Sequence, residues 1–139
     1  MKHLADSVDP LLGLLAIWQL WRLARERRLG FLLATTGAMA LLAAFNQADR
    51  ALGWWRSMEL DFSMHTAVGV SLATSLVVAD RRWIVAVVPI LVGYGFLMDH
   101  LGFHGWGDVL TSAPVAIAVT LACHGLARRY RRARTASTA

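Results

Sequence analysis

The sequence has few charged residues and almost no cysteine or lysine, and each shortage excludes a class of protein. Charged residues make up 17% of the 139 residues, against about 25% in an average soluble domain. Cys123 is the only cysteine, which excludes an internal disulfide and a cysteine-based zinc site. Lys2 is the only lysine, which argues against a Schiff-base enzyme or a retinal protein.

Apolar residues are abundant instead, at 57% of the chain, and the length fits one domain. They fall into five stretches bounded by charge or glycine, each near the roughly 20 residues that a helix needs to cross a bilayer. The stretches cover residues 10–24, 29–45, 64–79, 83–98 and 109–127. We therefore predict an all-α fold, a polytopic membrane helical bundle of five transmembrane helices. It forms a single domain over residues 1–130, and residues 131–139 form a basic, disordered cytoplasmic tail.

The arginines predict how this bundle is oriented. With the N-terminus outside, three inner segments hold most of the 14 basic residues, and the positive-inside rule favours that N-out/C-in topology. These arginines are Arg22, Arg25, Arg27, Arg28, Arg81, Arg82, Arg128, Arg129, Arg131, Arg132 and Arg134. Because they are split among three segments, the net charge of +5 indicates contact with anionic lipids of the bilayer and no nucleic-acid partner. We expect a multi-pass protein of the plasma (inner) membrane.

Histidines and carboxylates gather in the segments that this topology places at the outer face. They are Glu59, Asp61, His65, Asp99, His100, His104 and Asp108. Ionisable groups at a membrane usually have a function, since burying them is costly. The sequence therefore predicts a functional site on the extracytoplasmic side.

Two motifs within this set carry specific chemistry. Residues 61–67 (Asp-Phe-Ser-Met-His-Thr-Ala) open an apolar stretch, where Ser63 is a candidate N-cap and the amides after it can bind an anion. In residues 104–110 (His-Gly-Trp-Gly-Asp-Val-Leu), Asp108 follows His104 by four positions. Asp108 can then accept the Nδ1–H of His104 and leave Nε2 as a nucleophile or base. Alternatively, the nearby glycines form a tight turn and Asp108 only caps the next helix.

These motifs resemble those of the type 2 phosphatidic acid phosphatase superfamily, which includes lipid and polyprenyl-pyrophosphate phosphatases, sphingolipid synthases and vanadium haloperoxidases. Its Pro-Ser-Gly-His motif is similar to residues 62–65 (Phe-Ser-Met-His), and its His-x-x-x-Asp motif is similar to residues 104–108. The resemblance covers residues 62–113. It implies a phosphatase or phosphotransferase that acts on a lipid or polyprenyl phosphate at the outer face without a metal or cofactor.

The resemblance also implies roles for individual residues. His104 would attack phosphorus to give a phosphohistidine, and Asp108 would orient it. His65 would protonate the leaving alkoxide and then activate water, while amides near Ser63 hold phosphate oxygens.

The chain departs from the superfamily where the phosphate-binding arginine should lie. Leu97 and Met98 occupy the Ser-Arg positions, and Met64 replaces the motif glycine. Arg50 and Arg56 precede the first motif and are candidates for the missing positive charge. The candidate substrate-binding residues are Ser63, Arg50, Arg56, Asp61 and His100.

Two other interpretations arise from the same residues. His100 and His104 are four apart, a common spacing of metal ligands on a helix. With Glu59, Asp61, His65, Asp99 and Asp108 they predict a Zn, Mn or Fe site in a hydrolase or transporter. The third interpretation is a degenerate, non-catalytic member that binds a lipid headgroup or serves as a structural subunit. In that case a homo-oligomer would help to bury the polar rim.

Overall fold

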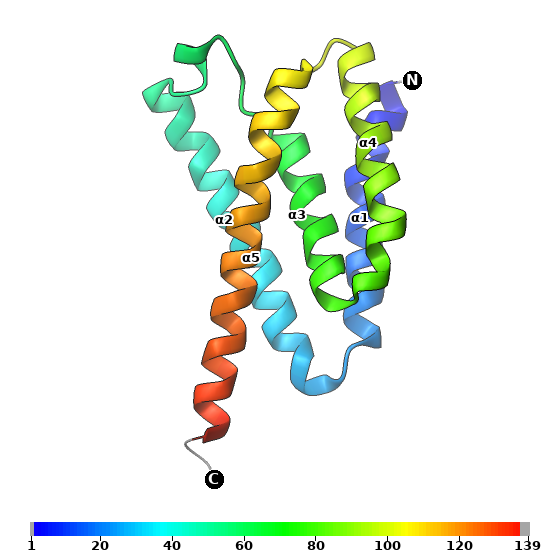
Figure 1. The fold of residues 1–139 in the computed structure, drawn as a ribbon, viewed down its shortest axis with the longest axis vertical. Helices are drawn as coiled ribbons and strands as arrows, with labels where there is room; N and C mark the ends of the chain where they lie inside the picture. The colour runs from blue at the N-terminus through cyan, green and yellow to red at the C-terminus, as the bar shows by residue number, and fades with distance from the viewer. Residues whose placement is uncertain (1, 137–139) are drawn as a thin grey trace.

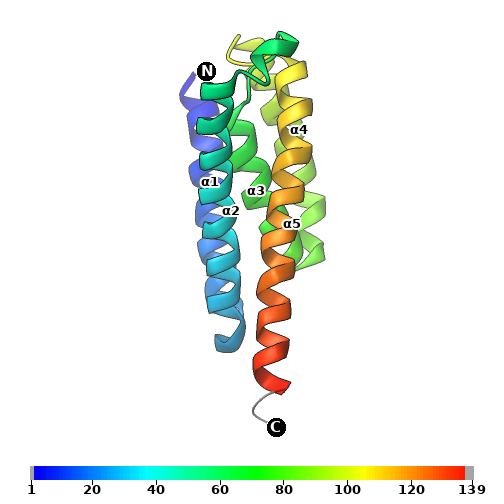
Figure 2. The ribbon, with the colours of Figure 1, turned by 90° about the vertical axis from the view of Figure 1, so that its left-hand side faces the viewer.

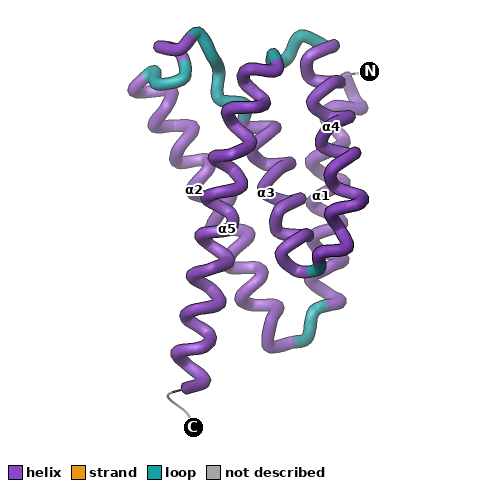
Figure 3. Tube along the Cα trace, in the orientation of Figure 1, coloured by secondary structure: helices purple, strands orange, loops and turns teal. Residues whose placement is uncertain are grey.

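The computed structural model describes residues 2–136 and, within them, the side chains of residues 8–134 and 136. Five α-helices fill nearly all of this length, and the described residues contain no strand (Figure 3). They are α1 (Lys2–Arg22), α2 (Arg25–Leu52), α3 (Met64–Ala79), α4 (Ile84–His100) and α5 (Trp106–Ala136), with short 3-10 turns η1 (Arg56–Met58) and η2 (Arg81–Trp83). The predicted all-α helical bundle is therefore confirmed.

The helices run side by side, so that all connections lie at two ends of the bundle (Figure 1). The N-terminus and the connections 53–63 and 101–105 lie at one end, which we call the loop end. The turns at 23–24 and 80–83 and the last turns of α5 lie at the other, which we call the arginine end. Figure 2 shows that α5 extends past its neighbours at the arginine end.

Three helical segments are long and apolar enough to cross a membrane. They are Arg25–Leu52, Arg81–His100 and Trp106–Arg134, while the apolar α3 is shorter. α1 is not among them, because Asp9, Gln19 and Arg22 interrupt its apolar residues. Large apolar side chains point outward from several helices, for example Val85 at 78% exposure, as expected of helices that face lipid. The structure supports three candidate spans, and five crossings stay a prediction.

Helix α3 matches its predicted bounds, whereas α2 and α5 are longer than the apolar stretches within them. A helix of Arg25–Leu52 includes the predicted span 29–45, and α5 includes the predicted span 109–127. Residues 131–136, expected to be disordered, continue α5 as helix, because arginine and alanine are good helix formers. The end of the predicted tail, residues 137–139, lies outside the described residues.

Helix α3 is the centre of the bundle, with α1 and α4 on one side and α2 and α5 on the other (Figure 1). One core cluster joins α3 to α1 and α4, through residues such as Leu12, Leu76 and Val87. A second joins α3 to α2 and α5, through residues such as Leu42 and Ala116. Because neighbours cover it on both sides, α3 is apolar or small around its whole circumference beyond its first turn, residues 68–79.

Three small residues of α3 at helical spacing, Ala67, Ser71 and Ser75, let α5 approach closely. Ser71 Oγ lies 2.8 Å from Thr120 Oγ1, and Ser75 Oγ lies 3.1 Å from His124 Nε2. All four polar side chains are buried. The contacts between the two helices are therefore polar as well as apolar.

Candidate functional site

The pair of His104 and Asp108 lies at the loop end, where the chain turns from α4 into α5. Gly102 has a φ of +69°, which suits glycine and lets the chain reverse within residues 101–105. His104 Nδ1 lies 3.5 Å from Asp108 Oδ2, and the two side chains are 14% and 16% exposed. The predicted proximity of this imidazole and this carboxylate is confirmed.

The carboxylate of Asp108 is held in place by two backbone amides. Its Oδ1 accepts a hydrogen bond from Asp61 N at 2.8 Å, and its Oδ2 accepts one from Gly105 N at 3.2 Å. Asp108 thus caps the start of α5. It also connects α5 to Asp61, in the segment that precedes α3. The capping interpretation is therefore correct, whereas His104 Nδ1 lies 3.5 Å from Asp108 Oδ2 without the predicted hydrogen bond.

A second carboxylate lies near the same ring nitrogen of His104. Asp61 Oδ2 is 4.0 Å from His104 Nδ1, on a side chain that is 79% exposed. His104 Nδ1 itself is buried and has no hydrogen-bond partner among the described residues. Two negative oxygens beside Nδ1 favour a proton on that atom, which leaves Nε2 with its lone pair.

His65 is held by a residue that the sequence did not indicate. Its Nδ1 lies 3.2 Å from Oδ2 of Asp9 on α1, and the His65 side chain is 59% exposed. Burial raises the pKa of the Asp9 carboxyl, and the hydrogen bond to His65 and its charge oppose that shift. An acid directly before Pro10, at the start of an apolar stretch, was the signal in the sequence that could have suggested Asp9.

Ser63 is the N-cap of α3, as predicted. Its Oγ accepts a hydrogen bond from Thr66 N at 3.3 Å, and its own N–H donates to Ser112 Oγ at 2.9 Å. Since Ser63 is fully buried and its hydroxyl is engaged, a phosphate oxygen would be bound by neighbouring amides. That anion site stays a prediction.

Polar contacts hold the end of α2 and the loop after it, which together carry the candidate cations Arg50 and Arg56. Asp49 is 6% exposed and accepts a hydrogen bond from Trp55 N at 2.9 Å, while Trp55 Nε1 donates to Thr111 Oγ1 at 3.0 Å. Arg50, in the last turn of α2, and Arg56, in η1, are both exposed beside these contacts. The structure therefore keeps both arginines at the loop end.

The predicted metal ligands do not form a metal site in the part of the chain that the structure describes. No group of three His, Cys, Asp or Glu side chains there is arranged to hold an ion. His100 ends α4, so His100 and His104 do not share a helical face. Glu59, Asp99 and His100 are exposed, and Glu59 has a positive φ of 58° at the end of η1. The structure gives the metal interpretation no support.

No protein-family model matches this chain, and no curated protein and no solved structure matches it either. A function for this protein is therefore inferred from the geometry of the loop end and from its sequence motifs.

Proposed function

We propose that the loop end catalyses phosphoryl transfer from a lipid or polyprenyl phosphate, with His104 as the nucleophile. The observation that carries the proposal is that two histidines at this end each pair through Nδ1 with a carboxylate, His104 with Asp108 and His65 with Asp9. Such pairing fixes the orientation of an imidazole and leaves Nε2 for chemistry. The resemblance of residues 62–65 and 104–108 to the phosphatase motifs supports the same assignment.

The proposed reaction has two steps. Nε2 of His104 attacks phosphorus, the bond from phosphorus to the lipid oxygen breaks, and the leaving alkoxide takes a proton from Nε2 of His65. Nε2 of His65 then takes a proton from water, the water oxygen attacks phosphorus, and the phosphorus–nitrogen bond breaks. Phosphate and the lipid alcohol are the products, and both histidines return to their starting states.

The charge of the transferred group has several partners at this end. Helices α3 and α5 both begin there, and helix N-termini attract anions. Arg50 and Arg56 are the candidate cations, and electrostatic stabilisation of this kind is the main contribution in phosphoryl transfer. A helical bundle with apolar outer faces would hold the site at the membrane interface, where a lipid phosphate lies. In the proposed N-out topology with five crossings, that interface is extracytoplasmic.

Phosphate release from purified protein in detergent tests the proposal. The substrates are phosphatidate, phosphatidylglycerophosphate and undecaprenyl pyrophosphate, each with and without a chelator. We expect release by the wild type that a chelator leaves unchanged. His104→Ala should lower it by at least about 1,000-fold, and His65→Ala by about 100- to 10,000-fold.

The control variant is Gln47→Ala, an exposed polar residue of α2, which should keep wild-type activity. Equal helical circular dichroism would show that the variants fold. Release that survives His104→Ala would refute the nucleophile, and release that a chelator abolishes would favour the metal interpretation. If no substrate is hydrolysed, the non-catalytic interpretation replaces this one.

A further inference from the structure

A cavity of about 310 Å³ opens at the arginine end, opposite the candidate phosphatase site. It forms because α3 has 16 residues, whereas α2 has 28 and α5 has 31. At about 1.5 Å per residue, α3 is shorter than either neighbour by roughly 20 Å. The first turns of α2 and the last turns of α5 thus enclose a space beyond Val78 and Ala79, where α3 ends.

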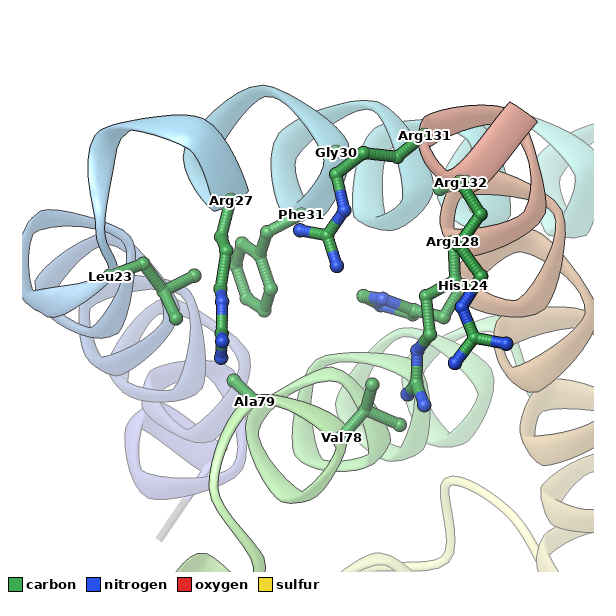
Figure 4. Close-up of a pocket in the computed structure, with 11 residues that line it drawn as sticks. Leu23, Arg27, Gly30, Phe31, Val78, Ala79, His124, Arg128, Arg131 and Arg132 are labelled. Atoms are coloured by element: carbon green, nitrogen blue, oxygen red, sulfur yellow. The ribbon is translucent and has the colours of Figure 1, made fainter. Parts of the chain in front are cut away.

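The walls of this cavity are strongly basic. Arg27 lines it from α2, and Arg128, Arg131 and Arg132 line it from α5. Figure 4 shows the Arg27 side chain on one side of the space and Arg128 and Arg131 on the others. Among the described residues that line the cavity there is no carboxylate. Asp80, which directly follows α3, does not line the cavity. Its carboxylate accepts a hydrogen bond from Arg82 N.

The inner wall is a buried imidazole. His124 is 5% exposed and its Nε2 is 3.1 Å from Ser75 Oγ. Its ring centroid is 5.7 Å from that of Phe31, which lies on α2. These contacts fix the imidazole at the inner end of the cavity, between α2 and α5 (Figure 4). Polar and cationic groups therefore converge from two helices, α2 and α5, and the rest of the lining is apolar or glycine, such as Leu23 and Val78.

From this arrangement we infer that the arginine end binds a phosphate group, with Arg27 and Arg128 as its main ligands and His124 at its base. Guanidinium groups bind phosphate oxygens in pairs of parallel hydrogen bonds. Basic pockets between membrane helices are suited to anionic headgroups. The phosphate can belong to a lipid headgroup or to a free inorganic phosphate. The inference does not depend on the proposed function, since it concerns other residues at the other end of the bundle.

Binding to purified full-length protein in an uncharged detergent tests the inference and identifies the source of the phosphate. The probes are a short-chain phosphatidate, a short-chain phosphatidylcholine, inorganic phosphate and pyrophosphate. We expect a saturable site for phosphatidate that His104→Ala retains, which separates it from the loop end, and at least tenfold weaker binding of phosphatidylcholine. Pyrophosphate or phosphate binding as tightly as phosphatidate would assign a free anion, and their failure to bind would assign the lipid headgroup.

A pair of double variants separates the cavity from the general charge of this end. Arg27→Gln with Arg128→Gln should weaken binding of the preferred probe at least tenfold. Arg25→Gln with Arg129→Gln removes the same charge from exposed positions of the same helices outside the cavity, and it should change binding less than twofold. Equal losses in both would mean diffuse electrostatic attraction and would overturn the inference. An absence of saturable binding to the wild type would overturn it as well.

Discussion

Nδ1 of His65 lies 3.2 Å from Oδ2 of Asp9, although 56 positions of sequence separate the two residues. This contact joins the first turn of α3 to α1 at the loop end. It also places a partly buried carboxylate beside an exposed imidazole. His65 therefore has the same kind of partner that Asp108 provides for His104, and the two pairs together support the proposed acid–base and nucleophilic roles.

The raised pKa of Asp9 predicts a specific dependence of stability on pH. A carboxyl whose pKa is higher in the folded state binds its proton more tightly there. The resulting stabilisation is present below the ordinary value of 3.8 and is lost as the pH rises through the raised pKa. We expect Asp9→Asn to remove this loss, since an amide does not ionise. Thermal unfolding in detergent from about pH 4 to pH 6 should show the wild-type midpoint falling relative to that of Asp9→Asn.

A constant difference between the two midpoints over this range would contradict the prediction.

Replacement of Asp108 should separate its structural role from its chemical one. Asp108→Ala removes the acceptor for the amides of Asp61 and Gly105 and should lower the free energy of unfolding by about 1.5–3 kcal/mol, the range for hydrogen bonds to charged groups. Asp108→Asn keeps one acceptor oxygen and should cost less. Denaturant or thermal unfolding in detergent measures both variants.

The proposed function adds an expectation for the same pair of variants. Asp108→Asn should still lose most phosphate release, because its amide no longer provides the charge that orients His104. A variant that loses stability and activity in proportion would indicate that Asp108 acts only as a cap.

Two glycines of α4 should respond in opposite ways to alanine. A Cβ on Gly95 would lie 3.0 Å from Cη2 and 3.1 Å from Cζ3 of the Trp106 ring. That ring packs edge-on against Phe96, with ring centroids 5.0 Å apart. A rigid ring cannot yield as a flexible side chain can, so Gly95→Ala should destabilise the protein by about 1–3 kcal/mol.

Gly93 is the matched control, because a Cβ there meets nothing within 4 Å. Gly93→Ala should stabilise α4 by roughly 0.5–1 kcal/mol through helix propensity. Unfolding midpoints of both variants test the pair, and equal shifts would show that Trp106 does not press on α4.

Much of the fold could be predicted from the sequence because a helix is a local structure. The apolar stretch 64–79 predicts α3 with its observed bounds, and Ser63 predicts its N-cap. The ends of α2 and α5 were less predictable. Charged residues mark where an apolar stretch stops, but arginine and alanine let a helix continue beyond it. The same holds for part of the candidate site. The contact of His104 with Asp108 could be predicted, because the two residues are four positions apart and a single turn brings them together.

The sequence by itself determined the helical fold, the grouping of His65, His100 and His104 away from most arginines, and the proximity of His104 to Asp108. Each of these depends on composition or on spacing within a few residues. Only the tertiary structure decided that Asp9 pairs with His65, that the Asp61 amide fastens to Asp108, and that α2 and α5 enclose a basic cavity beyond the end of α3. Those features depend on how helices distant in the chain pack and on their relative lengths, and no local pattern specifies either.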